Sequence, residues 1–410
     1  MATSNSDSPD ALRSGESPDR FPTWPSFDAD EIAAVERVMR SGRVNYWTGD
    51  EGRSFEREFA AAAGCAHGVA LANGTVALEL ALRVLGVGEG DEVITPSRSF
   101  IATASCAVNV GATPVFVDVD KDSQNVSAET LRSAITPRTR AIIVVHLAGW
   151  PCDMDPILQL AGEHGIPVIE DCAQAHGALY KGRPVGSMGT LGAFSFCQDK
   201  ILTTAGEGGM IVTQDRELFE AAWAYKDHGK SFDAVYRREH PIGFRWLHES
   251  FGSNGRLTEM QSAVGRIQLR KLEGWVQLRR RNAAILSDTL ERLPALRVPV
   301  PGQEDYHSYY RHSYYRYYAF VRPERLRPEW TRDRIMETLA TRGVSCTVGS
   351  CSEIYLEKAF PESMRPKNRL EVARELGETS LAFQVHPTLN EDHMKCIADR
   401  IEEVVSEATN

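Results

Sequence analysis

Short apolar runs alternate with segments of helical periodicity from about residue 67 onward, and this alternation limits the fold more than any other feature. The runs lack a strict polar–apolar alternation, which is typical of strands in a parallel sheet that helices cover on both faces. The pattern therefore predicts an α/β fold whose large domain is doubly wound, with a mainly parallel sheet. The predicted strands are HGVALA (67–72), DEVITPS (91–97), TPVFVDVD (113–120), AIIVVHL (141–147) and PVIEDC (167–172).

The composition changes along the chain and divides it into three parts. Residues 1–25 are rich in Ser, Asp and Pro and lack the apolar core of a secretory signal, so we expect a disordered tail. Residues 26–285 form the predicted large domain, which ends in a long segment of helical periodicity. Residues 286–410 contain a tyrosine-rich stretch and a final amphipathic helix, and they predict a smaller C-terminal α+β domain.

Charge and composition argue against several classes of protein. The chain carries 46 basic and 56 acidic residues, a net charge of −10, which disfavours a nucleic-acid or anionic membrane surface. The tyrosines of residues 306–318 could stack on bases, but this charge favours packing or a domain interface. No run approaches the ~18 apolar residues of a membrane span. The eight cysteines form no CxxC pair, so we expect reduced thiols, a cytoplasmic location and no metal.

Polar residues occupy three of the places where a predicted strand leads into a loop or helix, which is where open α/β sheets bind ligands. In the first of them, "ANGTVAL", Gly74 lets the backbone approach an anion, and Thr75 adds a hydroxyl at the helix N-terminus. Such a turn could hold a phosphate, although many turns of this kind contain glycine for close packing alone.

The second place is "VIEDCAQAHG", in which Glu170 and Asp171 follow an apolar strand. Asp171 could be a metal ligand, a helix cap or the partner of a cationic ring nitrogen, and this stretch alone does not decide between them. Gln174 and His176 follow closely. For His176, a satisfied structural histidine is favoured over a catalytic one.

The third place is "FSFCQDKILTTAGEGGMIVT", which contains Ser195 and Lys200. Lys200 is either a surface charge on a turn or an amine in a cleft, where burial would lower its pKa and let it form a Schiff base. Ser195 could add a contact to a phosphate. A phosphate cradle, a carboxylate for a ring nitrogen and a lysine for an aldehyde together match one cofactor, pyridoxal 5'-phosphate.

The same segments, in their order along the chain, carry a resemblance to a known family. Over nearly everything after the tail, the chain resembles the DegT/StrS family of sugar aminotransferases, which are fold type I pyridoxal-phosphate enzymes. A chance match to the whole ordered series is very improbable. The motifs are NGTVALELAL, GDEVITPSRSFIATA, ATPVFVDVD, VVHLAGWPCDMDPI, EDCAQAHGA, GAFSFCQDKILTTAGEGGMIVT and GSNGRLTEMQSAVGRIQL.

The resemblance implies a role for each candidate residue. Lys200 corresponds to the Schiff-base lysine, and Asp171 to the carboxylate that keeps the pyridine nitrogen protonated. Gln174 corresponds to the residue at the ring hydroxyl, and Phe100 to the aromatic ring that stacks on the cofactor. Asn254 corresponds to an asparagine that reaches the phosphate from the neighbouring subunit, which implies a homodimer with a shared active site. Three residues fall where the family binds the cofactor phosphate: Gly74, Thr75 and Ser195.

The implied reaction is a ping-pong transamination. L-Glutamate or L-glutamine gives its amine to the cofactor, which then aminates a keto-sugar. The sugar is usually nucleotide-linked, and the product serves surface polysaccharides or secondary metabolites. One alternative is a ketocyclitol or related ketone as the acceptor. Another is a non-catalytic sensor or regulator that binds pyridoxal phosphate, but the presence of Lys200, Asp171 and Gln174 together argues against it.

The chain departs from the common family pattern in segments that we expect to shape the acceptor pocket. Residues 197–199, Cys-Gln-Asp, precede the lysine where His-Pro-Thr is common, and Ala148 follows "HL" where Tyr or Phe is frequent. Residues 229–250 and 348–360 look peculiar to a subgroup. The sequence therefore leaves open which acceptor is used and which carbon is aminated.

Overall fold

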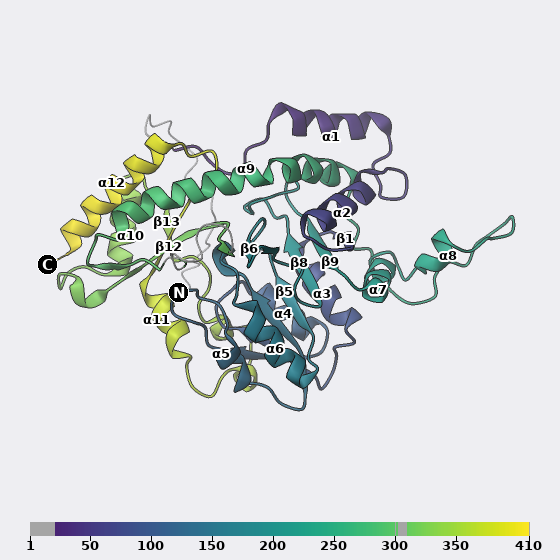
Figure 1. The fold of residues 1–410 in the computed structure, drawn as a ribbon, viewed down its shortest axis with the longest axis horizontal. Coiled ribbons are helices and arrows are strands. Elements are labelled where there is room, and N and C mark those ends of the chain that lie inside the picture. The colour runs from purple at the N-terminus through teal and green to yellow at the C-terminus, as the bar shows by residue number, and fades with distance from the viewer. Residues whose placement is uncertain (1–20, 300, 302–309, 410) are drawn as a thin grey trace, which may run out of the picture.

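A seven-stranded sheet lies at the centre of the large domain (Figure 1). The computed structural model describes residues 21–299, 301 and 310–409. In their order across the sheet, the strands are β1 (His67–Leu71), β9 (Gly209–Thr213), β8 (Leu191–Ser195), β5 (Val168–Asp171), β4 (Thr139–Val145), β2 (Glu92–Pro96) and β3 (Thr113–Val117). All of them run parallel except β9, which is antiparallel to both of its neighbours.

Helices cover both faces of this sheet, which explains why its strands read as continuous apolar runs. Along β4, Ile143 packs into one core, whereas Ile142 and Val144 pack into another on the opposite face. The prediction of a doubly wound α/β domain is confirmed. The first face carries α3 (Gly74–Val84), α4 (Ala102–Asn109) and α7 (Arg216–Lys226), and the second carries α2 (Glu51–Ala62), α5 (Ala128–Arg132) and α6 (Met154–His164).

The helix α9 (Glu259–Leu290) connects the large domain to the small one. It runs along the top of the molecule in Figure 1 and crosses the predicted domain boundary at residue 285. At its N-terminal end it packs against α1 (Ala29–Ser41), where Ala34 and Val38 contact its buried side chains.

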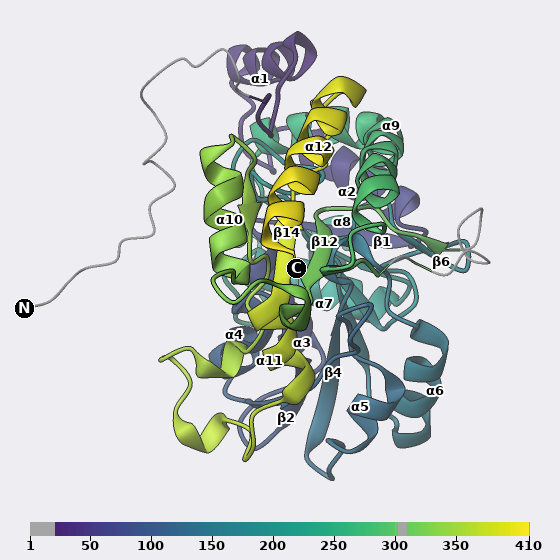
Figure 2. The same ribbon diagram turned by 90° about the vertical axis from the view of Figure 1, so that its left-hand side faces the viewer.

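The small domain is built on a four-stranded antiparallel sheet (Figure 2). Tyr317 and Ala319 on one face of this sheet pack against α9 and two further helices, whereas Tyr318 and Phe320 pack into a core of the large domain. The two domains therefore share buried apolar surface. The elements of the small domain are β10 (Leu296–Arg297), β12 (Tyr317–Val321), β14 (Ser380–Phe383), β13 (Cys346–Thr347), α10 (Arg332–Thr341), α11 (Glu371–Thr379) and α12 (Glu391–Ala408).

Short elements complete the described chain. A small sheet joins the two domains, because β11 pairs with β6, which in turn pairs with β7. Its strands are β6 (Leu179–Tyr180), β7 (Arg183–Pro184) and β11 (Tyr310–Arg311). The helix α8 (Phe232–Tyr236) projects from the large domain at the right of Figure 1. Four 3-10 helices are η2 (Leu147–Gly149), η4 (Pro323–Arg325), η5 (Ile354–Leu356) and η6 (Glu362–Met364).

The predicted tail of residues 1–25 lies largely outside the described residues, which begin at Phe21. The five described residues of this stretch are packed against the body of the protein. The Trp24 indole donates a hydrogen bond to the carbonyl oxygen of Lys200 at 2.8 Å, and its ring meets that of Trp275 edge-on. No helix in the described ranges combines the length and the apolar composition that crossing a membrane requires.

The tyrosine-rich stretch bears on the packing of the domains. Residues 302–309, which include part of the tyrosine-rich stretch, lie outside the described ranges, but Tyr314, Tyr315 and Tyr318 are buried. Packing of these tyrosines, rather than base stacking, is therefore what the structure supports.

A buried ion pair lies within the large domain. The fully buried ammonium of Lys226 donates a hydrogen bond to the Glu56 carboxylate and lies over the ring of Tyr46.

Candidate active site

The carboxylate of Asp171 lies at the C-terminal end of β5 and is almost completely buried. The hydroxyl of Thr103 donates a hydrogen bond to its Oδ2 at 2.9 Å, and the backbone N–H of Ala173 donates to its Oδ1 at 3.1 Å. Burial raises the pKa of Asp171, and these donors together with Lys200 offset only part of that effect. Within the described chain it forms no salt bridge, so it is a buried carboxylate suited to a cationic partner.

The N-terminus of α3 and the end of β8 approach each other closely beside this carboxylate strand. The Asn73 side chain caps α3 by accepting a hydrogen bond from the backbone N–H of Val76 at 2.9 Å. A Cβ atom on Gly74 would lie only 2.6 Å from the Cβ of Ser195, so this approach requires glycine. Thr75 occupies the first turn, whose N–H groups lack helical acceptors and suit an anion. The structure thus brings together the three predicted phosphate residues.

Lys200 lies on a turn after β8, and its side chain is only 17% exposed. Its backbone N–H donates to the carbonyl of Cys197 at 3.0 Å, which closes the turn. Its Nζ lies 3.5 Å from Oδ1 of Asp199 and 4.9 Å from the centre of the Tyr315 ring. Lys200 is therefore a largely buried amine beside a carboxylate and a tyrosine ring, rather than a free surface charge.

The pKa of Lys200 differs from the expectation drawn from the sequence. Burial alone lowers the pKa of this amine, as expected, but Tyr315 and Asp199 more than offset it, and the pKa lies above its ordinary value. The expectation of a lowered pKa was wrong because it considered burial without Tyr315 and Asp199, the neighbours that raise the pKa. Asp199 belongs to the stretch that departs from the common family pattern.

Gln174 connects the large domain to the small one at the edge of the site. Its Oε1 accepts a hydrogen bond from the backbone N–H of Ala148 at 2.8 Å, and its Nε2 donates to Oγ of Ser350 at 3.4 Å. Ala148 adopts a left-handed conformation, with φ of 58°, in the short helix η2. The amide of Gln174 is therefore held on both sides, three residues beyond Asp171.

Two of the predicted residues, Phe100 and Asn254, are exposed. The Phe100 side chain is 65% exposed and follows Ser99, whose backbone N–H donates to the carbonyl of Cys351. Asn254 is exposed and pairs through its backbone with Asp227. In the described ranges, no hydrogen bond or ring contact joins either side chain to Lys200 or Asp171 within the protomer.

His176 is buried between aromatic rings. Its ring centroid lies 5.5 Å from that of Phe194 and 5.7 Å from that of Phe196. Burial, with a smaller contribution from the charge of Lys200, lowers the pKa of His176 to about 3. A neutral ring packed in a core agrees with a structural histidine, but neither ring nitrogen has a hydrogen-bond partner in the described chain, so the expectation of a satisfied histidine is not met.

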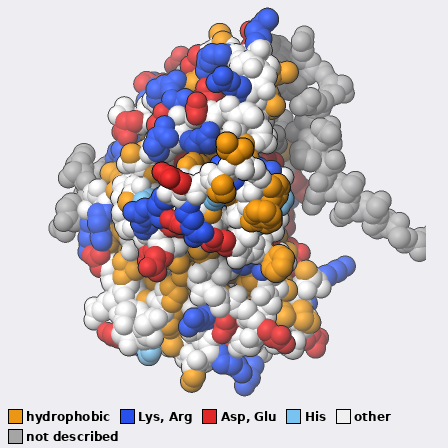
Figure 3. All heavy atoms as spheres, turned by 90° about the vertical axis from the view of Figure 1, so that its right-hand side faces the viewer, with side chains coloured by type: hydrophobic (Ala, Val, Ile, Leu, Met, Phe, Trp, Pro, Cys, Tyr) orange, Lys and Arg blue, Asp and Glu red, His pale blue; other side chains and the backbone are white. Residues whose placement is uncertain are grey.

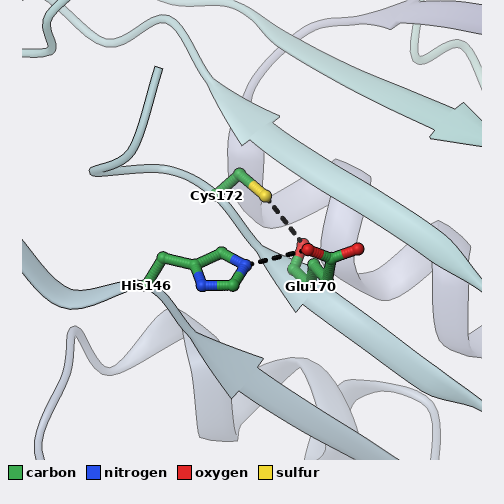
Figure 4. A group of neighbouring side chains, drawn as sticks. All are labelled: His146, Glu170 and Cys172. Atoms are coloured by element: carbon green, nitrogen blue, oxygen red, sulfur yellow. Dashed lines mark hydrogen bonds and ion pairs between the residues drawn. The ribbon is translucent and has the colours of Figure 1, made fainter. Parts of the chain in front are cut away.

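The residues on either side of Asp171 in the sequence, Glu170 and Cys172, form a buried group with His146 (Figure 4). His146 accepts a backbone hydrogen bond from Cys152 at its Nδ1, so its Nε2 carries the proton and donates to Glu170 at 2.9 Å. The Cys172 thiol is directed at the Glu170 backbone carbonyl. The Glu170 carboxylate accepts three backbone N–H groups, from Gly186, Met188 and Gly189. Because these atoms already have partners, the group supports the end of β5 and is not an open metal site.

Sequence reasoning missed three residues of the cluster. Thr103 orients Asp171, Tyr315 contacts Lys200, and Trp24 holds the backbone of the lysine turn. Thr103 carried a signal, since it follows a predicted strand in the segment SRSFIATA. Tyr315 and Trp24 come from the small domain and the N-terminal stretch, and no local pattern relates them to a loop more than a hundred residues away.

The fold and its similarity to proteins of known structure define the class of this protein. It is a pyridoxal-phosphate-dependent aminotransferase of fold type I. The chain is similar to an aminotransferase from Psychrobacter cryohalolentis whose X-ray structure is known. The two sequences are 52% identical, the structures superpose with a TM-score of 0.92, and the match covers 95% of this chain and 100% of that chain. Residues 25–402 match the profile of the DegT/DnrJ/EryC1/StrS aminotransferase family, and the chain belongs to that family. Both the resemblance and the fold class predicted from the sequence are confirmed.

Two curated relatives have sugar-nucleotide names. The dTDP-3-amino-3,4,6-trideoxy-alpha-D-glucose transaminase of Streptomyces venezuelae is 36% identical over 375 residues, 92% of each chain. The UDP-N-acetyl-3-dehydro-alpha-D-glucosamine 3-aminotransferase of Acidithiobacillus ferrooxidans is 38% identical over 355 residues, which is 87% of this chain and 89% of that protein.

Proposed function

We propose that the protein transfers an amino group from L-glutamate or L-glutamine to a nucleotide-linked keto-sugar, in amino-sugar biosynthesis for surface polysaccharide or secondary metabolites. The observation that supports the chemistry is that the largely buried Lys200 amine acts electrostatically on the buried carboxylate of Asp171, which forms no ion pair in the described chain. The names of the relatives, a dTDP-sugar and a UDP-sugar enzyme, support the acceptor class. A cytoplasmic location agrees with the free thiols.

The residues present fit pyridoxal phosphate. Asp171 is a buried carboxylate that lacks a cation in the described chain. The first turn of α3, which lies against Ser195, has backbone N–H groups without helical acceptors. We assign Lys200 as the residue that holds the cofactor covalently. Gln174 would contact the ring hydroxyl. When bound, the cofactor supplies the sink for the electron pair released at the substrate carbon.

The chain's own residues then carry out the remaining tasks. Asp171 keeps the ring nitrogen protonated, because a buried anion favours a charged partner. Thr75 and Ser195 hold the phosphate with the first N–H groups of α3. Phe100 would stack on the ring. Lys200, once released, moves a proton between two carbon atoms as general base and then as general acid.

We assign a homodimer as the active form, with Asn254 reaching the phosphate of the partner subunit. The exposed position of Asn254 supports this assignment, since a residue used across an interface needs no partner in its own protomer. The segment just before it exposes large apolar side chains: Ile242, Phe244, Trp246 and Phe251. Figure 3 views the end of the molecule from which α8 projects, and hydrophobic side chains gather on that face among charged ones. A second copy would cover such a patch.

An absorbance experiment tests the proposed function. Glutamate should convert the lysine-bound chromophore, expected at about 420 nm, to the aminated form of the cofactor. That form should revert only with a suitable ketone, drawn from nucleotide-linked keto-sugars and ketocyclitols, and NMR of the product gives the carbon aminated. A chromophore that ignores every amino acid would support the sensor alternative. Reversion with ketocyclitols alone would support that acceptor.

Mixing two inactive variants tests the shared site. A dimer with one Lys200→Ala subunit and one Asn254→Ala subunit contains one site with both residues intact, provided that Asn254 acts across the interface. Activity should therefore return on mixing. If the mixture stays no more active than the Asn254→Ala protein alone, the sharing of Asn254 is wrong.

A further inference from the structure

The carboxylate of Asp199 lies next to the amine of Lys200 and is held there from a second side. Its Oδ1 lies 3.5 Å from Nζ of Lys200, and its Oδ2 accepts a hydrogen bond from the hydroxyl of Tyr315. Asp199 belongs to the turn that the backbone hydrogen bond from Lys200 to Cys197 closes. Its two oxygen atoms thus have different partners, and this fixes the orientation of the carboxylate.

Tyr315 is itself rigidly placed. Its backbone N–H donates to the carbonyl of Ala148 at 2.8 Å, and its ring packs against Ile201, the residue after the lysine. The guanidinium of Arg316 lies over the same ring, 5.2 Å from its centre. The small domain therefore delivers a hydroxyl to Asp199 from a buried, anchored side chain. An ion pair built in this way loses less side-chain entropy than a flexible surface pair.

We propose that Asp199, oriented by Tyr315, is the counter-ion that fixes the position and the protonation state of the Lys200 amine during proton transfer. This inference rests on the proposed transamination. Asp199 is a positioning residue, since it contacts Lys200 and acts through it. The inference gives a function to one of the residues in which the chain departs from the His-Pro-Thr pattern.

The proton transfer balances within this arrangement. In the proposed reaction a carbon–hydrogen bond of the substrate would break and a nitrogen–hydrogen bond would form on Nζ of Lys200, while the bound cofactor would supply the sink for the electron pair. The ammonium then gives the proton to the second carbon, so that its nitrogen–hydrogen bond breaks and Lys200 is neutral again. Between the two events Lys200 carries a positive charge, and the fixed negative charge of Asp199 stabilises it.

The charges around the amine support this role. Burial raises the pKa of Asp199, but Lys200, Tyr315 and Arg316 more than offset it, so the carboxylate is ionised at neutral pH. No other carboxylate of the described chain forms an ion pair with Lys200. Three groups raise the pKa of Lys200: Tyr315, Asp199 and Cys197. The charge of Lys200 in turn lowers the pKa of Asp171 and of His176, and Arg316 lowers that of Asp199.

The test measures the protonation of Lys200 in the full chain freed of cofactor. Competitive acetylation with acetic anhydride over a range of pH, read by mass spectrometry of the Lys200 peptide, gives the midpoint for this amine, with exposed Lys395 as the internal reference. We expect Asp199→Asn to lower the midpoint by about 1–3 pH units, since an opposite charge at this distance is removed. Tyr315→Phe should lower it by less, because the carboxylate remains but is no longer held.

The matched control is Glu207→Gln, which removes a carboxylate from the same loop. Its Oε1 lies near the Cys197 thiol and forms no ion pair with Lys200, so the midpoint should stay at the wild-type value. An unchanged midpoint in Asp199→Asn would overturn the proposal. An equal fall in Glu207→Gln would show that any carboxylate of the loop has this effect on Lys200, and it would overturn the specific pairing with Asp199. A wild-type midpoint in Tyr315→Phe would refute the orienting role of the tyrosine.

A second readout links the pairing to the reaction. The pH dependence of the first half-reaction with glutamate should shift to lower pH in Asp199→Asn, because the neutral amine is then populated at lower pH. A purely structural role would change the rate without moving the profile. The labelling needs neither cofactor nor substrate. A lowered midpoint in a protein that does not transaminate would therefore refute the proposed function alone, and a transaminating protein with an unchanged midpoint would refute the pairing alone.

Discussion

The substitution Gly74→Ala tests the assignment of the α3 N-terminus as the phosphate site. The first residue of α3 lies against the end of β8, and an alanine there would place a methyl group between them. That Cβ would lie 2.6 Å from the Cβ of Ser195 and 3.1 Å from both its Cα and its Oγ. Carbon atoms in contact need about 3.5–4.0 Å, so the helix and the strand must separate by about 1 Å.

The cost of that separation sets the expected effect. Overpacking of this kind costs about 1–3 kcal/mol. Because binding the phosphate requires Thr75, Ser195 and the helix N–H groups at their native spacing, we expect the same free energy to be lost from cofactor binding. The dissociation constant for pyridoxal phosphate should therefore rise about 5- to 150-fold.

The assay is a titration of the cofactor-free protein with pyridoxal phosphate, followed by absorbance. The control is Gly162→Ala in α6, where a Cβ would have no neighbour within 4 Å; its affinity should be unchanged and its stability slightly higher. If Gly74→Ala does not fold, Thr75→Val removes only the hydroxyl and should weaken binding by about 0.5–1.5 kcal/mol. A folded Gly74→Ala protein with wild-type affinity would refute the phosphate assignment.

Three further substitutions have expected outcomes. Asp171→Asn should bind the cofactor but slow the half-reaction with glutamate severely, since no anion would keep the ring nitrogen protonated; a near-normal stopped-flow rate would contradict the assignment. His176→Phe should flatten the acid side of the stability profile. The native histidine has a pKa of about 3, so between pH 6.5 and 3 the unfolded chain binds a proton that the folded chain does not. Because of this residue alone, the free energy of unfolding falls by about 1.4 kcal/mol for each unit by which the pH is lowered. Urea unfolding between pH 5 and 7 measures the slope, and an unchanged slope would contradict it. Lys226→Met should cost about 3–5 kcal/mol because it leaves the Glu56 carboxylate buried without a cation, and adding Glu56→Gln should recover much of the loss in urea unfolding.

The location of ligand sites at the carboxyl ends of parallel strands explains which parts of the site could be predicted from the sequence. Parallel strands bring their carboxyl ends to one edge of the sheet, so the ends of β5 and β8 had to meet, and with them Asp171 and Ser195. Gly74 was predictable for a related reason, since the turn into α3 opens at the same edge. These inferences use only local pattern and the topology of a doubly wound sheet.

The parts that could not be predicted depend on contacts between distant segments. Tyr315 reaches the lysine because the loop before β12 packs on Ala148, and Trp24 does so because the N-terminal stretch passes over α9. Neither packing arrangement leaves a periodic pattern in the sequence. The pKa of Lys200 was mispredicted for the same reason, since its direction depends on Tyr315 and on the orientation that it gives to Asp199.

The two aspartates of the site show how environment, and not residue type, separates their functions. Asp171 is fully buried, receives its hydrogen bonds from neutral donors and has a raised pKa, so it gains most from a cation that arrives with a ligand. Asp199 is partly exposed, lies beside Lys200 and has a lowered pKa, so it is already paired. Under the proposed roles, exchanging these environments would leave the ring nitrogen of the cofactor without a partner and the Lys200 amine without a counter-ion. Lys200 can therefore carry a proton close to Asp199, while the charge of Asp171 remains available to a cationic ligand. Under the proposed pairing, the residue directly before Lys200 thus bears on how the amine works.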